Sequence, residues 1–129
     1  MVSVTAIIQA RMGSTRFPGK SLRPIAGLPM LEHIIIRLKQ VPEIDLILLA
    51  IPEKESEVPL VELAHQLQVP VFQGSEDDVL GRFIKAGESV QTEHVVRVCG
   101  DNPLIDMPLS SSLIQAHLSD NADYTIPDD

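Results

Sequence analysis

Residues 9–20 combine the residue types that bind polyphosphate. In twelve positions this segment holds three cations, two glycines and two hydroxyl side chains. Arg11, Arg16 and Lys20 can neutralise phosphate charge and donate to phosphate oxygens. The glycines allow the backbone to approach a ligand closely and to present N–H groups to it. Solvated arginines of an ordinary surface loop would be the preferred interpretation for one cation, but the whole cluster favours an anion-binding loop.

Two better-known phosphate loops do not match this segment. A P-loop has four residues between its first glycine and Gly-Lys-Ser/Thr. Here five residues, among them Pro18, separate Gly13 from Gly19. The dinucleotide fingerprint Gly-x-Gly-x-x-Gly is also missing. The spacing therefore argues against a P-loop kinase and against a dehydrogenase.

A second candidate site follows the apolar run at 94–99. Asp101 lies there in the sequence Gly-Asp-Asn-Pro. Magnesium binds one or two carboxylates together with water and phosphate oxygens, so Asp101 could supply half of a metal site. The same tetrapeptide is also good turn chemistry, and Asp101 could only cap a turn. Asp106 is more typical of a helix cap before Pro108.

Both segments resemble the sugar-acid cytidylyltransferases. The similarity runs through residues 6–22 and 25–31 and returns in the Gly-Asp-x-Pro-Leu-Ile sequence from Gly100. This group includes the CMP-KDO and CMP-sialic acid synthetases, and the spore-coat polysaccharide branch resembles the chain most. The shared motif is long and specific. It covers most of the chain but only about the first half of a family member.

The resemblance implies roles for individual residues. Arg11 and Lys20 would be catalytic and contact the triphosphate, the backbone near Ala10 and Gly13 would hold the cytidine, and Asp101 would bind magnesium. Residues 71–83 resemble the third-strand region of the spore-coat branch, which borders the nucleotide. The nucleotide-binding candidates are thus Ala10, Arg11, Gly13, Ser14, Arg16, Lys20, Gly74, Ser75 and Arg82. Arg82 has an alternative, a helical ion pair with Asp78 four residues earlier.

The resemblance also implies a reaction and its partners. A hydroxyl of a sugar acid would attack the α-phosphorus of CTP and expel pyrophosphate, with catalysis by positioning and by charge stabilisation. KDO, sialic acid and related nonulosonic acids all remain open as acceptors. Longer relatives carry further segments for the second metal carboxylate, the sugar pocket and a homodimer. A non-catalytic nucleotide-binding module is therefore the alternative function.

The elements that must position these residues follow an α/β pattern. Unbroken or short apolar runs predict strands, and apolar residues at helical spacing predict helices. Strands are expected at 4–8, 46–51, 69–72, 94–99 and 124–126, and helices at 29–41, 58–67, 77–90 and 108–118. Such alternation predicts a Rossmann-like, mostly parallel sheet with helices on both faces and ligands at the carboxyl ends of its strands. The loops after the first and fourth strands should meet at that edge.

Three further expectations concern charged and apolar residues on these elements. The helix at 77–90 should pack through Val79, Leu80, Phe83, Ile84 and Gly87 and carry acidic residues in its first turn. The acidic run at 53–57 is most simply a solvated loop. The four histidines share no spacing and predict no metal site.

Composition limits the class of protein. The 129 residues, 44% of them hydrophobic, fit a single globular domain, and the chain stops just after a predicted strand begins, which we take as a sign of truncation. The net charge of −8 opposes binding to nucleic acid or to an anionic membrane. The chain contains one cysteine and no secretory signal, and no apolar run is long enough to span a bilayer. A cytoplasmic protein is expected.

Overall fold

The core of the fold is a parallel sheet. The computed structural model describes residues 3–12, 20–100 and 107–120. In this part of the chain the main sheet has the strand order β5-β4-β1-β6, and all three neighbouring pairs are parallel. The strands are β1 (Val4–Gln9), β4 (Leu46–Pro52), β5 (Val71–Gly74) and β6 (His94–Cys99). The prediction of a parallel sheet is confirmed, and the strand expected at 124–126 lies outside the described residues.

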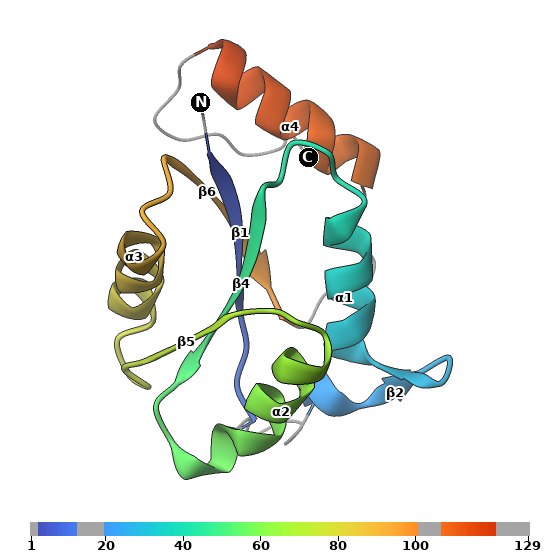
Figure 1. Ribbon diagram of the computed structural model, residues 1–129, viewed down its shortest axis with the longest axis vertical. Coiled ribbons are helices and arrows are strands. Elements are labelled where there is room, and N and C mark those ends of the chain that lie inside the picture. The colour runs from blue at the N-terminus through green and yellow to red at the C-terminus, as the bar shows by residue number, and fades with distance from the viewer. Residues whose placement is uncertain (1–2, 13–19, 101–106, 121–129) are drawn as a thin grey trace.

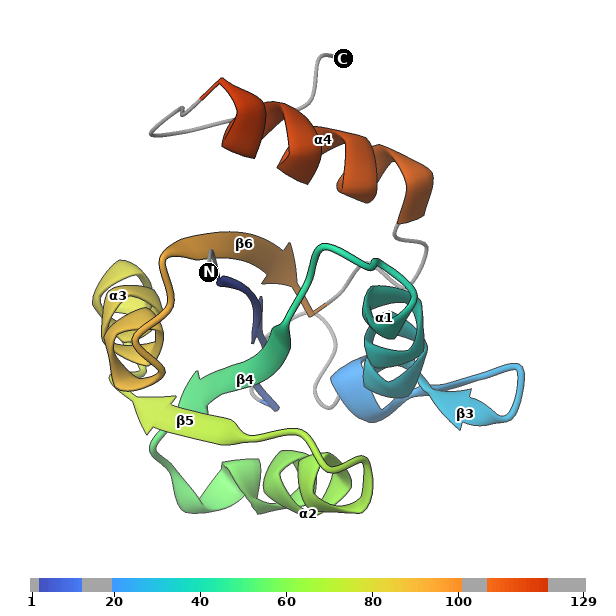
Figure 2. The ribbon, with the colours of Figure 1, turned by 45° about the horizontal axis from the view of Figure 1, so that its top comes forward.

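Helices cover both faces of this sheet, as predicted. They are α1 (Met30–Lys39), α2 (Val58–Gln66), α3 (Val79–Ser89) and α4 (Met107–Ser119). Figure 2 shows α1 and α3 on opposite sides of the strands. α1 and α2 share one apolar cluster with the sheet, and α3 belongs to another. α4 lies at the edge where β1 begins, with Ile114 in a cluster with Val4 and Val41 (Figure 1). None of the helices in the described ranges is long and apolar enough to cross a membrane.

β1 shows why its sequence is apolar without alternation. Ile7 packs in the cluster that includes α3, and Ile8 packs in the cluster that includes α1 and α2. Both side chains are fully buried. A strand covered on both faces needs apolar residues at successive positions, which is typical of parallel sheets.

A short hairpin between β1 and α1 was not predicted. After the 3-10 helix η1 (Lys20–Leu22), β2 (Pro24–Ile25) pairs antiparallel with β3 (Leu28–Pro29). Its two turn residues, Ala26 and Gly27, have φ angles of 50° and 85°. Positive φ at both positions is the geometry of a type I′ turn. The hairpin leads directly into α1, because Pro29 is the N-cap residue of that helix.

α3 differs from its prediction in two ways. The acidic residues precede the helix rather than fill its first turn, and Asp78 caps it by accepting a hydrogen bond from the Gly81 N–H at 2.9 Å. The buried face contains Arg82, Ala86 and Gly87. Phe83 packs against the core as expected. The prediction was wrong for three other residues, which are exposed to solvent: Val79 (41% exposed), Leu80 (66%) and Ile84 (49%).

Candidate functional site

The parallel strands all end at one edge of the sheet, the lower edge in Figure 1. The register pairs Gln9 with Ala50 on one side and with Cys99 on the other, and pairs Pro52 with Gly74. This edge therefore holds the exits of all four strands. The candidates located there in the described residues are Ala10, Arg11, Gly74, Ser75 and Arg82. The exits of β1 and β6 lie side by side at this edge, as predicted, and the roles of these candidates in nucleotide binding stay predictions.

The backbone that leaves β1 is held at successive positions. The Gly100 N–H donates to the Gln9 carbonyl at 2.8 Å, and the Ala10 N–H donates to the Ala50 carbonyl at 3.2 Å. The Met12 N–H donates to the Glu57 Oε2 atom at 2.8 Å. Ala10 is buried, whereas Arg11 is exposed. The side chain of Arg11 thus starts from a fixed backbone and extends into solvent.

Arg82 connects three elements at this edge. Its side chain is 3% exposed although it carries a guanidinium. Nη1 donates to the Ser75 carbonyl at 2.8 Å, and Nη2 donates to the Gln9 Oε1 atom at 3.1 Å. Nε is buried and has no hydrogen-bond partner among the residues that the structure describes. Arg82 therefore ties α3 to the exits of β1 and β5, whereas the Asp78 carboxylate considered as its partner accepts from the Gly81 N–H.

Burial and two neighbouring charges act on this guanidinium. Burial lowers the pKa of Arg82, since it disfavours the charged form. The Glu57 carboxylate opposes this effect, and the Arg11 charge lowers the pKa further. Two positive charges, on Arg11 and Arg82, and one buried negative charge, on Glu57, therefore interact at the carboxyl edge of the sheet. An anionic ligand would be attracted to the exposed member, Arg11.

Glu57 is a residue that the sequence analysis missed. It ends the 3-10 helix η2 (Glu55–Glu57) and is only 2% exposed, so the prediction of a solvated acidic loop was wrong at this position. Its buried carboxylate bonds to a residue 45 positions earlier in the chain. No local pattern could have identified that contact, because an acidic run before a helix is normally solvated.

Two glycines allow close packing at the same edge. A Cβ atom on Gly100 would lie 2.8 Å from both the Ala10 Cβ atom and the Gln9 carbonyl oxygen. A Cβ atom on Gly74 would lie 2.9 Å from the Phe72 Cε1 atom and 3.1 Å from the Arg82 Cγ atom. Because side chains would collide with backbone at Gly100, this position is the more restrictive of the two.

A Gly100→Ala variant is expected to unfold about 1–3 kcal/mol more easily than the native chain, since the added methyl group must displace the backbone of β1. Urea unfolding measures the change. Gly87→Ala in α3 is the matched control, because its Cβ atom would make ordinary contacts of 3.5 Å with Val95 Cγ2 and 3.8 Å with Ile7 Cδ1. That variant is expected to gain up to about 1 kcal/mol. Equal stability of the two variants would contradict the close approach at Gly100.

The structure describes only part of the predicted site. Gly13, Ser14, Arg16, Asp101 and Asp106 lie outside the described residues, and Lys20 is described only as the first residue of η1. Asp101 directly follows Gly100, which is hydrogen-bonded to Gln9. Among the described residues, no group of three or more His, Cys, Asp and Glu side chains could hold a metal ion.

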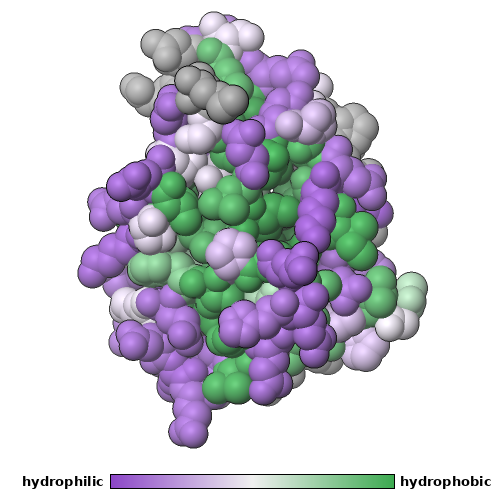
Figure 3. Space-filling model, viewed as in Figure 1, coloured by the Kyte–Doolittle hydropathy of each residue, from purple (hydrophilic) through white to green (hydrophobic). Residues whose placement is uncertain are grey.

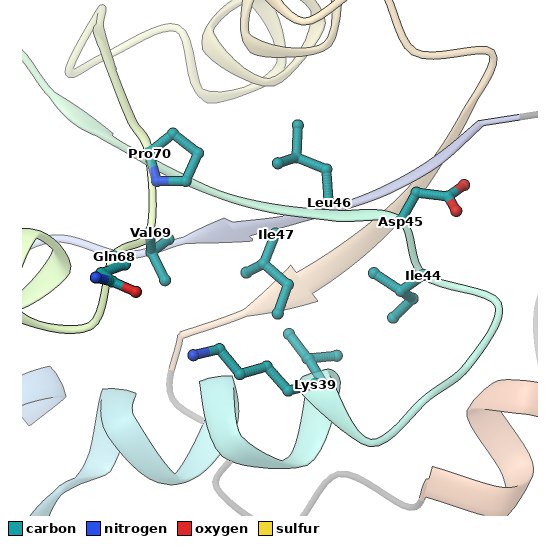
Figure 4. Close-up of a pocket in the computed structure, with 9 residues that line it drawn as sticks. Lys39, Ile44, Asp45, Leu46, Ile47, Gln68, Val69 and Pro70 are labelled. Carbon is teal, nitrogen blue, oxygen red and sulfur yellow. The ribbon is translucent and has the colours of Figure 1, made fainter.

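A cavity of about 250 Å³ lies at the opposite edge of the sheet. Figure 4 shows Leu46 and Ile47 from the start of β4 beside Val69 and Pro70, which precede β5. The surface over β4 on this side of the molecule is largely apolar (Figure 3). The cavity is thus separate from the carboxyl edge that carries the predicted phosphate-binding residues.

Comparison with known proteins decides the family. A family model described as cytidylyltransferase matches residues 5–127, which is nearly the whole chain. The chain belongs to the cytidylyltransferase family. It is 40% identical to the spore coat polysaccharide biosynthesis protein SpsF of Bacillus subtilis, over 97% of this chain and 54% of that protein.

Solved cytidylyltransferases share the fold of this chain. A cytidylyltransferase from Leptospira borgpetersenii superposes with a TM-score of 0.87 and 32% identity, over 92% of this chain and 50% of that one. CMP:2-keto-3-deoxy-manno-octonic acid synthetase complexed with CTP superposes with a TM-score of 0.82 and 25% identity, over 93% and 49%. The Rossmann-like fold predicted from the sequence is confirmed. The chain spans about half the length of the cytidylyltransferases that it matches.

Proposed function

We propose that this protein transfers CMP from CTP to a sugar acid and releases pyrophosphate, in the synthesis of a cell-surface polysaccharide. The observation that carries the proposal is the exposed Arg11 on a fixed backbone at the carboxyl edge, within a sequence that matches the cytidylyltransferase model. The similarity to a spore coat polysaccharide protein and to a synthetase solved with CTP supports the substrate class.

Arg11 and Lys20 are the proposed catalytic residues. Both would neutralise charge on the triphosphate, and the chemistry needs no covalent intermediate, because positioning and electrostatic stabilisation suffice for in-line displacement at phosphorus. Ala10, Gly13, Ser14 and Arg16 would complete the loop that surrounds the nucleotide. Gly74, Ser75 and Arg82 would border it from the β5 side.

Magnesium is the proposed cofactor, with Asp101 as its protein ligand. The donor chemistry fits this ion, because magnesium takes one or two carboxylates and completes its shell with water and phosphate oxygens. Asp101 follows Gly100 in the sequence, and the Gly100 N–H donates to the Gln9 carbonyl at the exit of β1. When bound, the ion would supply positive charge to the phosphate oxygens during transfer.

The remaining parts of the proposal concern partners and location. The acceptor is KDO, sialic acid or a related nonulosonic acid, and the 129 residues form one nucleotide-binding domain that works in the cytoplasm. A longer protein of this family would form a homodimer.

Calorimetric titration of the chain with CTP and with ATP, each with and without magnesium, tests this function. We expect CTP to bind in preference to ATP, magnesium to strengthen the binding and a Lys20→Ala variant to lose it. Pyrophosphate release with CTP and KDO or sialic acid then separates an enzyme from a binding module. Absence of binding for both nucleotides at millimolar concentration would refute the proposal for this chain.

A further inference from the structure

We propose that Glu57 is a positioning residue for nucleotide binding, which holds Arg11 in place through the backbone of Met12. The inference rests on the proposed function, since it assumes that Arg11 contacts the nucleotide. It adds a residue from the segment after β4, which contains none of the residues proposed above for nucleotide binding.

A hydrogen bond joins the Glu57 carboxylate to the backbone that leaves β1. The Met12 N–H donates to the Glu57 Oε2 atom at 2.8 Å, and Glu57 is almost fully buried. A buried carboxylate is costly unless hydrogen bonds compensate it, so a glutamate at this position requires a partner that repays its desolvation. Charge-assisted hydrogen bonds from backbone N–H groups are among the strong ones. The bond to Met12 therefore fixes the chain one residue beyond Arg11.

The Glu57 side chain does not cap α2, the helix that begins after it. Glu57 occupies the N-cap position of α2, where a side-chain oxygen commonly accepts a hydrogen bond from the first turn. The Glu57 side chain makes no such bond. Its carboxylate lies instead against the exit of β1, so the residue contributes to that segment rather than to the start of α2.

The residues before Arg11 are held as well. Arg82 holds the Gln9 side chain at 3.1 Å, and the Ala10 N–H bonds to Ala50. Residues on both sides of Arg11 are therefore anchored, by Glu57 after it and by Arg82 and β4 before it. The two buried charges also attract each other, because the Glu57 carboxylate favours the charged form of Arg82. Together they fix the backbone from which the exposed Arg11 side chain extends.

The test compares three substitutions of Glu57 by calorimetric titration with magnesium-CTP and by amide hydrogen exchange at Met12. Glu57→Ala removes the acceptor and is expected to weaken CTP binding by about tenfold or more and to accelerate exchange of the Met12 amide. Glu57→Asp keeps the charge but shortens the reach, so we expect the same two effects in weaker form. This variant replaces Glu57→Ala in the test if the alanine variant does not fold. Glu57→Gln keeps an acceptor at the same reach and should restore CTP affinity to within about threefold of the native chain.

Glu43→Ala is the matched control. The Glu43 carboxylate also accepts two short hydrogen bonds, both 2.6 Å long, from Ser111 and Gln115 of α4. Its loss should leave CTP affinity and Met12 exchange unchanged. An equal loss of affinity in Glu43→Ala and Glu57→Ala would overturn the proposal, because general destabilisation would then explain both.

The two proposals fail in different ways. If the native chain binds no CTP, the proposed function fails, while Met12 exchange still tests the anchor. If the native chain binds CTP and Glu57→Ala binds it equally well, the positioning role is refuted and the proposed function stands. Unchanged exchange of the Met12 amide in Glu57→Ala would refute the anchor itself.

Discussion

An Arg11→Ala variant is expected to bind CTP at least about tenfold more weakly than the native chain while unfolding at the same urea concentration. The affinity should fall because a charge-assisted hydrogen bond to phosphate is worth about 1.5–3 kcal/mol. The stability should not change because Arg11 is exposed and its backbone bonds belong to its neighbours. Calorimetric titration and urea unfolding of the same samples measure the two quantities.

Lys39→Ala provides the control for net charge. It removes one positive charge at the end of α1, beside the cavity on the opposite edge of the sheet (Figure 4). Its CTP affinity should equal that of the native chain. If both variants lose affinity to the same degree, the attraction would be a long-range effect of total charge, and Arg11 would lose its assigned contact.

An Arg82→Ala variant is expected to lose about 3 kcal/mol of unfolding free energy. The substitution removes two charge-assisted hydrogen bonds, to Ser75 and Gln9, from a buried position. It also leaves the buried Glu57 carboxylate without its nearby positive charge, which adds to the cost. Because a domain is stable by only about 5–15 kcal/mol, this loss should shift the urea midpoint clearly.

Lys85→Ala on the same helix is the control for Arg82. Lys85 is exposed, so its removal should change stability by less than about 0.5 kcal/mol. A loss below about 1 kcal/mol in Arg82→Ala would show that the guanidinium is dispensable for the carboxyl edge. The same outcome would count against a stabilising hydrogen bond between Arg82 and Gln9.

The main elements could be predicted because their apolar patterns are local. β1 and β4 are mainly apolar runs without alternation, and the buried residues of α1 recur at helical spacing. Each predicted strand and helix in the described ranges appears within about two residues of its expected bounds. The arrangement of the loops followed from the same pattern, since parallel strands place their exits at one edge.

The hairpin between β1 and α1 could not be predicted in the same way. Its strands are two residues long, too short to show alternation. The usual marker of a type I′ turn is Asn-Gly or Asp-Gly, whereas here Ala26 precedes Gly27 and adopts a positive φ of 50°. The surrounding contacts must therefore select this turn, including the Met30 N–H bond to the Arg23 carbonyl at 2.9 Å.

The burial of Arg82 and of Glu57 was not predicted, because the surroundings of both side chains come from distant parts of the chain. Arg82 is separated from Gln9 by 73 positions, and Glu57 from Met12 by 45. A helical pattern counts apolar residues and places charged ones outside, so it favoured Val79 and Leu80 for the buried face of α3. The structure reverses that choice, because the Arg82 guanidinium has polar partners on the sheet side of the helix.

If CTP binds at the carboxyl edge of the sheet, an NMR titration of the isotope-labelled chain with magnesium-CTP will show it residue by residue. We expect the backbone amide signals of Arg11, Met12, Ser75 and Gly100 to shift as CTP is added, while those of Ile47 and Val69 at the opposite cavity stay unchanged. Shifts confined to Ile47 and Val69, or no shift at all at millimolar CTP, would contradict binding at the carboxyl edge.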